Sequence, residues 1–268
     1  MKVATLQMNS GPDVAHNLGV AGQLLSDAAA AGAVLAVLPE NFALMGAKEA
    51  DRLAVAEAPG AGPIQDAVAE IAQKLSLWIV AGTMPIRGRS AQRVAPASIV
   101  FDAQGKQVAR YDKIHLFDVD IPDKREIYRE SATFEPGKEP IVVDTPVGKL
   151  GLSVCYDMRF PELYRQLSAQ GAQLLAMPAA FTVPTGQAHW EVLLRARAVE
   201  NLCYVLAAAQ WGMHANGRET YGDAMIVDYW GRVLGRRPSG AGVVVADVDT
   251  AAQAGVRAGF PALQHRVL

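Results

Sequence analysis

The sequence has little of what stabilises small secreted proteins, because only two cysteines, Cys155 and Cys203, occur in 268 residues. Two cysteines are too few for a disulfide framework. No apolar stretch approaches the roughly 18–20 residues that a membrane span needs. The start MKVATLQMNS enters a strand-like run without the basic segment and long apolar core of a secretory signal. We therefore expect a cytoplasmic protein in a reducing compartment, with no membrane partner.

The sequence also lacks an excess of either charge, since 25 lysines and arginines stand against 27 aspartates and glutamates. A net charge of −2 gives no electrostatic reason to expect binding to nucleic acid or to an anionic membrane. With 51% hydrophobic residues, a chain of this length can bury a large core and needs neither disulfides nor a metal for stability. This composition is typical of a soluble globular protein.

Short apolar runs rich in β-branched residues alternate with longer segments that carry apolar residues at helical spacing. The first half predicts strands at 3–8, 33–38 and 78–82, with helices at 14–30 and 63–75 between them. This βαβαβ order is typical of a largely parallel sheet that helices cover on both faces.

The second half mixes hairpins with further alternation of helix and strand. Turn-forming residues predict hairpins at 102–106, 144–148 and 228–231. Further helices or strands are expected at 161–170, 173–177, 188–201, 203–209 and 243–248. The polar stretch 114–137 has little periodicity, and so long a loop in a compact domain is more often functional than accidental. No linker or repeat interrupts the chain, so we expect one α/β domain over residues 1–268.

Cys155 ends the apolar strand Gly151-Leu-Ser-Val-Cys155, and Pro161 is well placed to open a helix soon after it. A nucleophile at such a corner projects from the sheet near helix N-terminal N–H groups. Those groups lower the pKa of a thiol and can stabilise an oxyanion. Most free cysteines are instead small buried hydrophobic residues. Cys203 lies inside an apolar run and is expected to be structural, so Cys155 is the candidate nucleophile.

A nucleophilic thiol needs a base or a cationic neighbour, and two kinds of partner remain open at this point. Glu40 and Lys113 each follow a predicted strand, so both would lie at the sheet edge where ligands gather in open α/β folds. Taken singly, either could equally be a solvated loop residue. His115 and His189 flank apolar segments and could instead form a Cys–His pair in an acyl-transfer enzyme.

Three blocks of the sequence resemble the catalytic blocks of the nitrilase, or carbon–nitrogen hydrolase, superfamily and occur in the family's order. They are Leu38-Pro-Glu40-Asn, Arg110-Tyr-Asp-Lys113-Ile-His-Leu-Phe and Cys155-Tyr-Asp-Met-Arg-Phe-Pro-Glu162. The similarity includes Gly186-Gln-Ala-His-Trp-Glu191 and Tyr229-Trp-Gly231, and so runs through essentially the whole chain. Three separate blocks in order are far more specific than any single motif.

The resemblance implies a four-layer αββα sandwich and a cysteine-dependent amidase with a Glu–Lys–Cys triad. Glu40 would be the general base that takes the thiol proton, and Cys155 would attack the amide carbon to form a thioester. Lys113 and the backbone N–H of Tyr156 would stabilise the oxyanion, and Lys113 beside the thiol would also favour the thiolate. Ammonia would leave, and water activated by Glu40 would then release the acid.

A second glutamate precedes a Phe-x-Pro-Gly turn in many members of the superfamily. The segment Glu130-Ser-Ala-Thr-Phe-Glu-Pro-Gly137 matches this pattern. Glu130 is therefore the candidate for positioning Lys113 or the substrate amide. Glu135 competes for that role, but it lies in the turn itself and is expected to face water.

The block around the nucleophile also bears on the substrate. Cys-Tyr-Asp stands where true nitrilases usually have Cys-Trp-Glu, which favours an amide over a nitrile. Met158 and Phe160 depart from the pattern of N-carbamoyl amide hydrolases, which remain an alternative. The chain is most similar to two branches, of which one hydrolyses deaminated glutathione and the other, ω-amidase, hydrolyses α-ketoglutaramate. The run 191–209 favours the first, and hydrolysis of a terminal amide to acid plus ammonia is expected.

Both substrates carry carboxylates, so the pocket should present a cation. Arg159 lies one helical turn beyond Cys155 and could clamp a carboxylate with two hydrogen bonds. Phe181 and Thr185 could line the pocket or simply pack within their loop. Arg197, like Arg195, is expected at the surface or at an interface. No metal-binding, dinucleotide-binding or phosphate-binding motif occurs, so neither a metal nor a cofactor is predicted.

The resemblance also implies a homodimer or a higher homo-oligomer, in which helices beside the active site form the contact. The segment 261–268 looks shorter than the usual family tail, which argues against a contact made by the tail. A non-enzymatic alternative is a scaffold that keeps the fold and has lost catalysis. The presence of all three triad residue types argues against that alternative.

Overall fold

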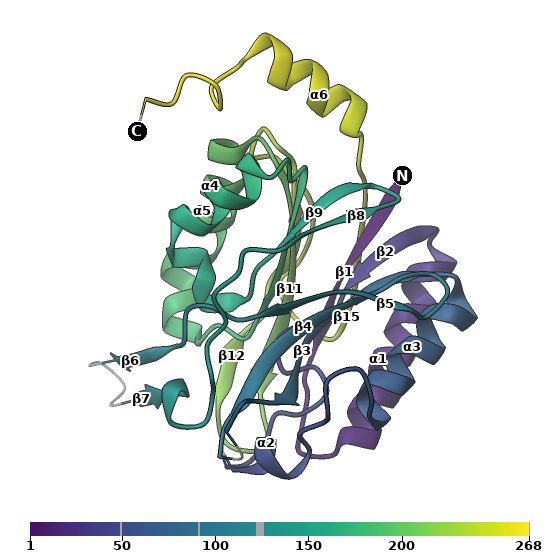
Figure 1. Cartoon of the computed structure of the whole chain (residues 1–268), viewed down its shortest axis with the longest axis vertical. Coiled ribbons are helices and arrows are strands. Elements are labelled where there is room, and N and C mark those ends of the chain that lie inside the picture. The colour runs from purple at the N-terminus through teal and green to yellow at the C-terminus, as the bar shows by residue number, and fades with distance from the viewer. Residues whose placement is uncertain (49, 91, 122–125, 268) are drawn as a thin grey trace.

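Strands form the centre of the molecule and helices cover two opposite sides of it (Figure 1). The computed structural model describes residues 1–48, 50–90, 92–121 and 126–267. One large sheet runs in the order β5-β4-β3-β2-β1-β11-β10-β9-β8. These strands are β1 (Lys2–Met8), β2 (Ala33–Val37), β3 (Trp78–Arg87), β4 (Val94–Phe101), β5 (Gln107–Asp112), β8 (Val142–Thr145), β9 (Gly148–Leu152), β10 (Leu174–Ala179) and β11 (Tyr204–Met213).

The first strand joins the two halves of this sheet, because β1 pairs in parallel with β2 on one side and with β11 on the other. Shorter strands extend the sheet: β15 pairs with β1, while β12 and β13 pair with β11. β14 continues beyond β13. Their bounds are β12 (Glu219–Tyr221), β13 (Ala224–Val227), β14 (Val233–Arg237) and β15 (Gly242–Asp247).

Two pairs of helices form the outer layers. On one side lie α1 (Val14–Ala30) and α3 (Pro63–Leu75), and on the other lie α4 (Pro161–Ala169) and α5 (Val183–Asn201). The short helix α2 (Asp51–Ala54) precedes α3, and α6 (Thr250–Gly259) follows the last strand. Helix, strand, strand and helix layers give the αββα sandwich, so the predicted fold class is confirmed.

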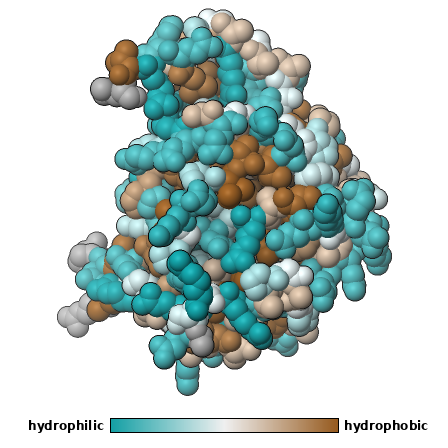
Figure 2. All heavy atoms as spheres, in the orientation of Figure 1, coloured by the Kyte–Doolittle hydropathy of each residue, from teal (hydrophilic) through white to brown (hydrophobic). Residues whose placement is uncertain are grey.

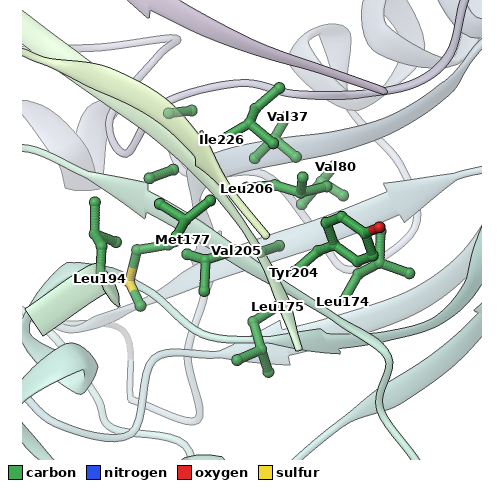
Figure 3. Close-up of a cluster of buried hydrophobic side chains, with 14 of the residues drawn as sticks. Val37, Val80, Leu174, Leu175, Met177, Leu194, Tyr204, Val205, Leu206 and Ile226 are labelled. Atoms are coloured by element: carbon green, nitrogen blue, oxygen red, sulfur yellow. The ribbon is translucent and has the colours of Figure 1, made fainter. Parts of the chain in front are cut away.

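The core divides into two clusters because side chains alternate between the faces of each strand. On β2 and just after it, Leu35 and Val37 face the inner cluster, whereas Ala36 and Leu38 face the cluster under α1 and α3. Figure 3 shows Val37 beside side chains from the other half of the sheet, within the inner cluster. The apolar run of the sequence therefore reflects burial on both faces, as in other sheets covered by helices.

The predicted elements agree closely with the structure where periodicity is strong, since α1 and α3 have the predicted bounds. The turns predicted at 102–106, 144–148 and 228–231 all join antiparallel strands. The polar stretch 114–137 was expected to lack regular structure, but it contains the hairpin of β6 (Asp118–Ile121) and β7 (Glu126–Arg129) and the 3₁₀ helix η2 (Glu130–Ala132). Strand β12 and helix α6 had not been predicted.

Hydrophilic side chains dominate the face of the molecule in Figure 2, and hydrophobic ones gather near its centre. Among the described residues, no helix combines the length and the apolar character required to cross a membrane.

Candidate active site

Cys155 lies at the corner that the sequence predicts, where the chain leaves β9 and enters the 3₁₀ helix η3 (Cys155–Arg159). Helix α4 then begins at Pro161, as expected. The φ angle of Cys155 is 49°, in the left-handed region that a residue with a Cβ adopts only when its surroundings impose it. The side chain is only 7% exposed. The thiol is therefore held in a fixed, largely buried position at the end of the strand.

Lys113 connects the predicted glutamates. Its side chain is fully buried, and Nζ lies 2.9 Å from Oε1 of Glu40 and 2.8 Å from Oε2 of Glu130. Lys113 directly follows β5, Glu40 comes just after β2, and Glu130 opens η2. Glu135, the competing glutamate, pairs with Arg89 instead and does not face water freely. The structure thus brings together residues from three separate connections around one ammonium group.

The charges of this cluster support one another. Burial alone would lower the pKa of Lys113, but the nearby Glu130 and Glu40 carboxylates outweigh it and raise that pKa above its usual value. Burial would conversely raise the pKa of Glu130, but the Lys113 ammonium and the Phe117 backbone N–H lower it on balance. Lys113 is consequently a permanent cation at neutral pH, and Glu130 is a permanent anion beside it.

The thiol of Cys155 has a pKa well above its usual value, which corrects the expectation of a favoured thiolate. Burial raises this pKa most, and the Glu40 carboxylate raises it further. Lys113 and the backbone N–H of Ala180 act in the opposite direction but do not prevail. Because Glu40 lines the same pocket as the thiol, the resting enzyme holds a protonated nucleophile beside its prospective base.

Asp157 fixes the backbone around the nucleophile, and the sequence reasoning did not single it out. Its buried carboxylate accepts hydrogen bonds from Tyr111 Oη at 2.7 Å, from the Val154 backbone N–H at 2.8 Å and from the His115 backbone N–H at 3.0 Å. The residues on both sides of Cys155 are thereby joined to the segment that carries Lys113. The only signal in the sequence was the Asp of Cys-Tyr-Asp.

Both histidines considered as partners of the thiol have other contacts. His115 Nδ1 lies 2.7 Å from Asp157 Oδ1, and its ring stacks on Phe160 at a centroid distance of 3.7 Å. His189 Nδ1 lies 3.2 Å from Arg159 Nη1. The geometry therefore favours Glu40 over a histidine as the base for Cys155.

A narrow pocket opens beside the thiol, with about 300 Å³ of unfilled space when the part open to solvent is counted. Its lining includes Glu40, Phe117, Glu130, Cys155, Tyr156, Arg159, Ala180, Phe181, Thr182, Thr185 and Arg218. All the residues proposed from sequence for substrate binding thus lie at this pocket. Thr185 is in the first turn of α5 and not in a loop, and its Oγ1 lies 2.8 Å from that of Thr182. Phe117, Thr182 and Arg218 are lining residues that the sequence reasoning missed.

Arg197 contradicts the expectation that it lies at the surface. It is 5% exposed, and its Nε donates a hydrogen bond of 2.9 Å to the Met158 carbonyl in η3. Helix α5 therefore supports the helix that carries the nucleophile. The expectation was wrong because the α5 sequence has no clear apolar stripe to show which face is buried.

In the part of the chain that the structure describes, no three or more His, Cys, Asp or Glu residues gather in a way that could hold a metal ion.

Comparison with known proteins gives a consistent result. The carbon-nitrogen hydrolase family matches residues 2–258. The deaminated glutathione amidase of Yersinia enterocolitica is 46% identical over 98% of this chain and 92% of its own length. The deaminated glutathione amidase of Homo sapiens is 40% identical over 98% of this chain and 81% of its own length.

Solved structures of similar proteins give the same result. The Caenorhabditis elegans NitFhit protein superposes with a TM-score of 0.92 at 38% identity, covering 99% of this chain, which spans only 65% of that fusion protein. Saccharomyces cerevisiae Nit3, a member of branch 10 of the nitrilase superfamily, has a TM-score of 0.89 at 30% identity, with 100% and 97% of the two chains covered. A mutant amidase from Nesterenkonia sp. AN1 was solved with the acetamide moiety of fluoroacetamide added covalently at its active-site cysteine. It has a TM-score of 0.83 at 28% identity, with 100% of this chain and 94% of that chain covered.

Proposed function

Because the chain belongs to the carbon–nitrogen hydrolase family and is an amide-hydrolysing enzyme, we propose that it hydrolyses deaminated glutathione with Cys155 as nucleophile. One observation carries the proposal: Cys155 and Glu40 line the same pocket, and Glu40 accepts a hydrogen bond of 2.9 Å from the buried Lys113. A nucleophile and a base at one pocket, with a fixed cation bonded to that base, are the parts that acyl transfer from an amide requires.

The first half-reaction forms a thioester. Glu40 takes the thiol proton while Cys155 Sγ attacks the amide carbon, so the sulfur–carbon bond forms without a free thiolate at rest. The oxyanion that develops is stabilised by Lys113 Nζ and by the backbone N–H of Tyr156. Glu40 then gives its proton to the leaving nitrogen, and the carbon–nitrogen bond breaks.

The second half-reaction restores the enzyme. Glu40 takes a proton from water, whose oxygen attacks the thioester carbon. The acid leaves, and the proton returns to Cys155 Sγ. Glu130 stays ionised throughout, because its role is to hold Lys113 in place and to keep it charged.

The chemistry of the substrate refines the expected product. The scissile bond of deaminated glutathione is a secondary amide, so its hydrolysis releases 2-oxoglutarate and the amine of cysteinylglycine. Ammonia, the product expected from sequence, would come only from a primary amide such as α-ketoglutaramate. Arg159 supplies the cation for the 2-oxo acid carboxylate that both molecules share, and its guanidinium lies 5.6 Å from the Phe181 ring centroid at the pocket.

The test is to measure 2-oxoglutarate release from deaminated glutathione and from α-ketoglutaramate, and ammonia release from N-carbamoyl amino acids as a third class. Cys155→Ala should abolish release, whereas Cys203→Ala should retain it, because Cys203 is buried beside Ala172 and Asn201 and lies outside the pocket. A preference for α-ketoglutaramate would assign the chain to the ω-amidase alternative. Equal release by wild type and Cys155→Ala would refute the nucleophile, and no release by folded wild type would refute both substrates.

We further propose that the enzyme is a homodimer that pairs through α5. The outer face of this helix exposes Val192 (62%) and Val199 (50%), and Trp230 (50%) is also exposed, in the neighbouring β13–β14 turn. Exposed apolar groups in such proximity are typical of a protein interface. Val192→Asp should convert the dimer to a monomer in sedimentation experiments, whereas Val108→Asp on β5 should not.

A cytoplasmic location is proposed from the two free, buried thiols.

A further inference from the structure

Arg218 lines the pocket beside Cys155, yet the proposed mechanism gives it no role. It belongs to the tight connection between β11 and β12, where its carbonyl accepts a hydrogen bond of 2.8 Å from the His214 backbone N–H. His214 is itself buried, with Nδ1 2.9 Å from the Ser10 carbonyl and Nε2 2.7 Å from Thr220 Oγ1. These hydrogen bonds hold the β11–β12 connection in place. The Arg218 guanidinium therefore reaches the pocket from a rigid backbone segment.

The guanidinium of Arg218 has more N–H donors than the described residues use in hydrogen bonds. Its Nη2 donates to the Ala180 carbonyl, and Cζ lies 5.3 Å from the centroid of the Tyr128 ring. Its Nε is buried and has no hydrogen-bond partner among the described residues. Within those residues it also forms no ion pair with an aspartate or glutamate. A buried donor without a partner is costly, and such a group next to a substrate pocket is suited to an anion that the substrate brings.

We propose that Arg218 forms a second anion subsite, which binds the C-terminal carboxylate of the leaving half of the substrate. The inference rests on the proposed function, because deaminated glutathione carries two carboxylates. One belongs to the 2-oxo acid, and the other belongs to the terminal glycine. Two arginines in one pocket, Arg159 and Arg218, match these two charges. A guanidinium binds a carboxylate with paired, charge-assisted hydrogen bonds.

The positions of the two arginines decide which carboxylate each one binds. Arg159 is on the same 3₁₀ helix as Cys155, and the acyl half of the substrate becomes covalently bonded to Cys155. The 2-oxo carboxylate is only a few bonds from the thioester carbon, so Arg159 is the arginine that binds it. Arg218 comes from a separate connection and packs on Tyr128 of the β6–β7 hairpin. Arg218 therefore binds the carboxylate that departs with the amine.

A structural role for Arg218 is the competing explanation. Its hydrogen bond to the Ala180 carbonyl could position the Ala180 backbone N–H, which acts to lower the pKa of the Cys155 thiol. Loss of that support would slow the reaction with every substrate to the same degree. Loss of an anion subsite would slow it only for substrates that carry the terminal carboxylate.

The experiment therefore compares deaminated glutathione with its C-terminal amide, in which the glycine carboxylate is neutral, and with α-ketoglutaramate. For Arg218→Gln we expect kcat/KM to fall about 10- to 100-fold with deaminated glutathione, the range of one lost charge-assisted interaction. With the other two substrates it should change less than about threefold. Arg218→Lys should recover part of the loss, and Arg232→Gln, which removes an exposed arginine outside the pocket, should have no effect. Equal losses with all three substrates would overturn the proposal.

A binding measurement separates this inference from the proposed function. In Cys155→Ala protein, which cannot turn over, calorimetry should show that deaminated glutathione binds at least about tenfold tighter than its C-terminal amide. Adding Arg218→Gln should remove that difference. This result would support the anion subsite even if wild type released no product. Equal affinity for the acid and the amide would refute the subsite, whatever the outcome of the turnover assay.

Discussion

The phenol of Tyr111 donates a hydrogen bond of 2.7 Å to the carboxylate of Asp157, across 46 positions of sequence. Both side chains are fully buried. Burial and the Asp157 charge raise the pKa of Tyr111 well above its usual value, so the phenol remains a donor at every physiological pH. The bond ties the end of β5, which leads to Lys113, to the helix η3 that begins with Cys155. It therefore maintains the spacing between cation and nucleophile.

Tyr111→Phe should lower the free energy of unfolding by about 1.5–3 kcal/mol, because it removes a buried hydrogen bond to a charged acceptor. Tyr164→Phe is the matched control, since Tyr164 is equally buried but donates to the neutral Ser153 hydroxyl at 3.0 Å. Tyr164→Phe should lower the free energy of unfolding by about 0.5–1.5 kcal/mol, because the lost hydrogen bond has a neutral acceptor. Urea denaturation of the two variants measures the difference. A larger cost for Tyr164→Phe would mean that the bond to Asp157 is not the stronger one.

Glu40→Gln should change the titration of Cys155 and the amidase activity in opposite directions. The Glu40 carboxylate raises the pKa of the thiol, so its neutralisation should lower that pKa and increase the thiolate fraction at pH 8. The activity should nevertheless fall by at least about 100-fold, because the general base is lost. Thiolate absorbance followed against pH gives the first quantity, with Cys155→Ala as baseline for Cys203. An unchanged or higher thiol pKa in Glu40→Gln would contradict the assignment.

The catalytic cluster could be predicted because its members lie at strand ends within short, ordered sequence blocks. Glu40, Lys113 and Cys155 each follow a predicted strand, so their positions relative to the sheet are set locally. The direction of the Cys155 pKa shift could not be predicted in this way. It depends on how deeply the folded chain buries the thiol, and burial outweighs the Lys113 charge.

Contacts between distant segments account for what the sequence did not reveal. Asp157 and Arg218 are held in place by partners such as Tyr111 and Ala180, which no local pattern associates with them. Arg197 looked like a surface residue because α5 places charged residues around much of its circumference. The side of that helix which packs on η3 is settled only by the tertiary fold.

The free energy of unfolding should decline in alkaline solution, in part through Cys203. Burial raises the pKa of this thiol to about 12, against about 8.5 for a cysteine in an unfolded chain. Between these values the unfolded state releases a proton that the folded state retains, so the stability present below about pH 8.5 is lost as the pH rises. Cys203→Ala should reduce the slope between about pH 9 and 11 by about 1.4 kcal/mol per pH unit. Identical slopes for wild type and variant would show that Cys203 does not contribute.

The Lys113–Glu130 pair should show strong coupling in a double-mutant cycle. Lys113→Met leaves two buried carboxylates without their cation and should destabilise the fold by about 3–5 kcal/mol. Adding Glu130→Gln removes one of those uncompensated charges, so the double variant should be more stable than Lys113→Met alone. Glu130→Gln in the wild-type background should instead be destabilising, because there Glu130 is a paired anion.

Urea denaturation of wild type, both single variants and the double variant gives the coupling free energy. The activity should be lost in both Lys113→Met proteins, so the stability gain from Glu130→Gln cannot come from a restored active site. If the two substitutions were additive within about 0.5 kcal/mol, the short contact between Lys113 and Glu130 would carry no net interaction. Glu130 would then have to act on the substrate amide and not through the position of Lys113.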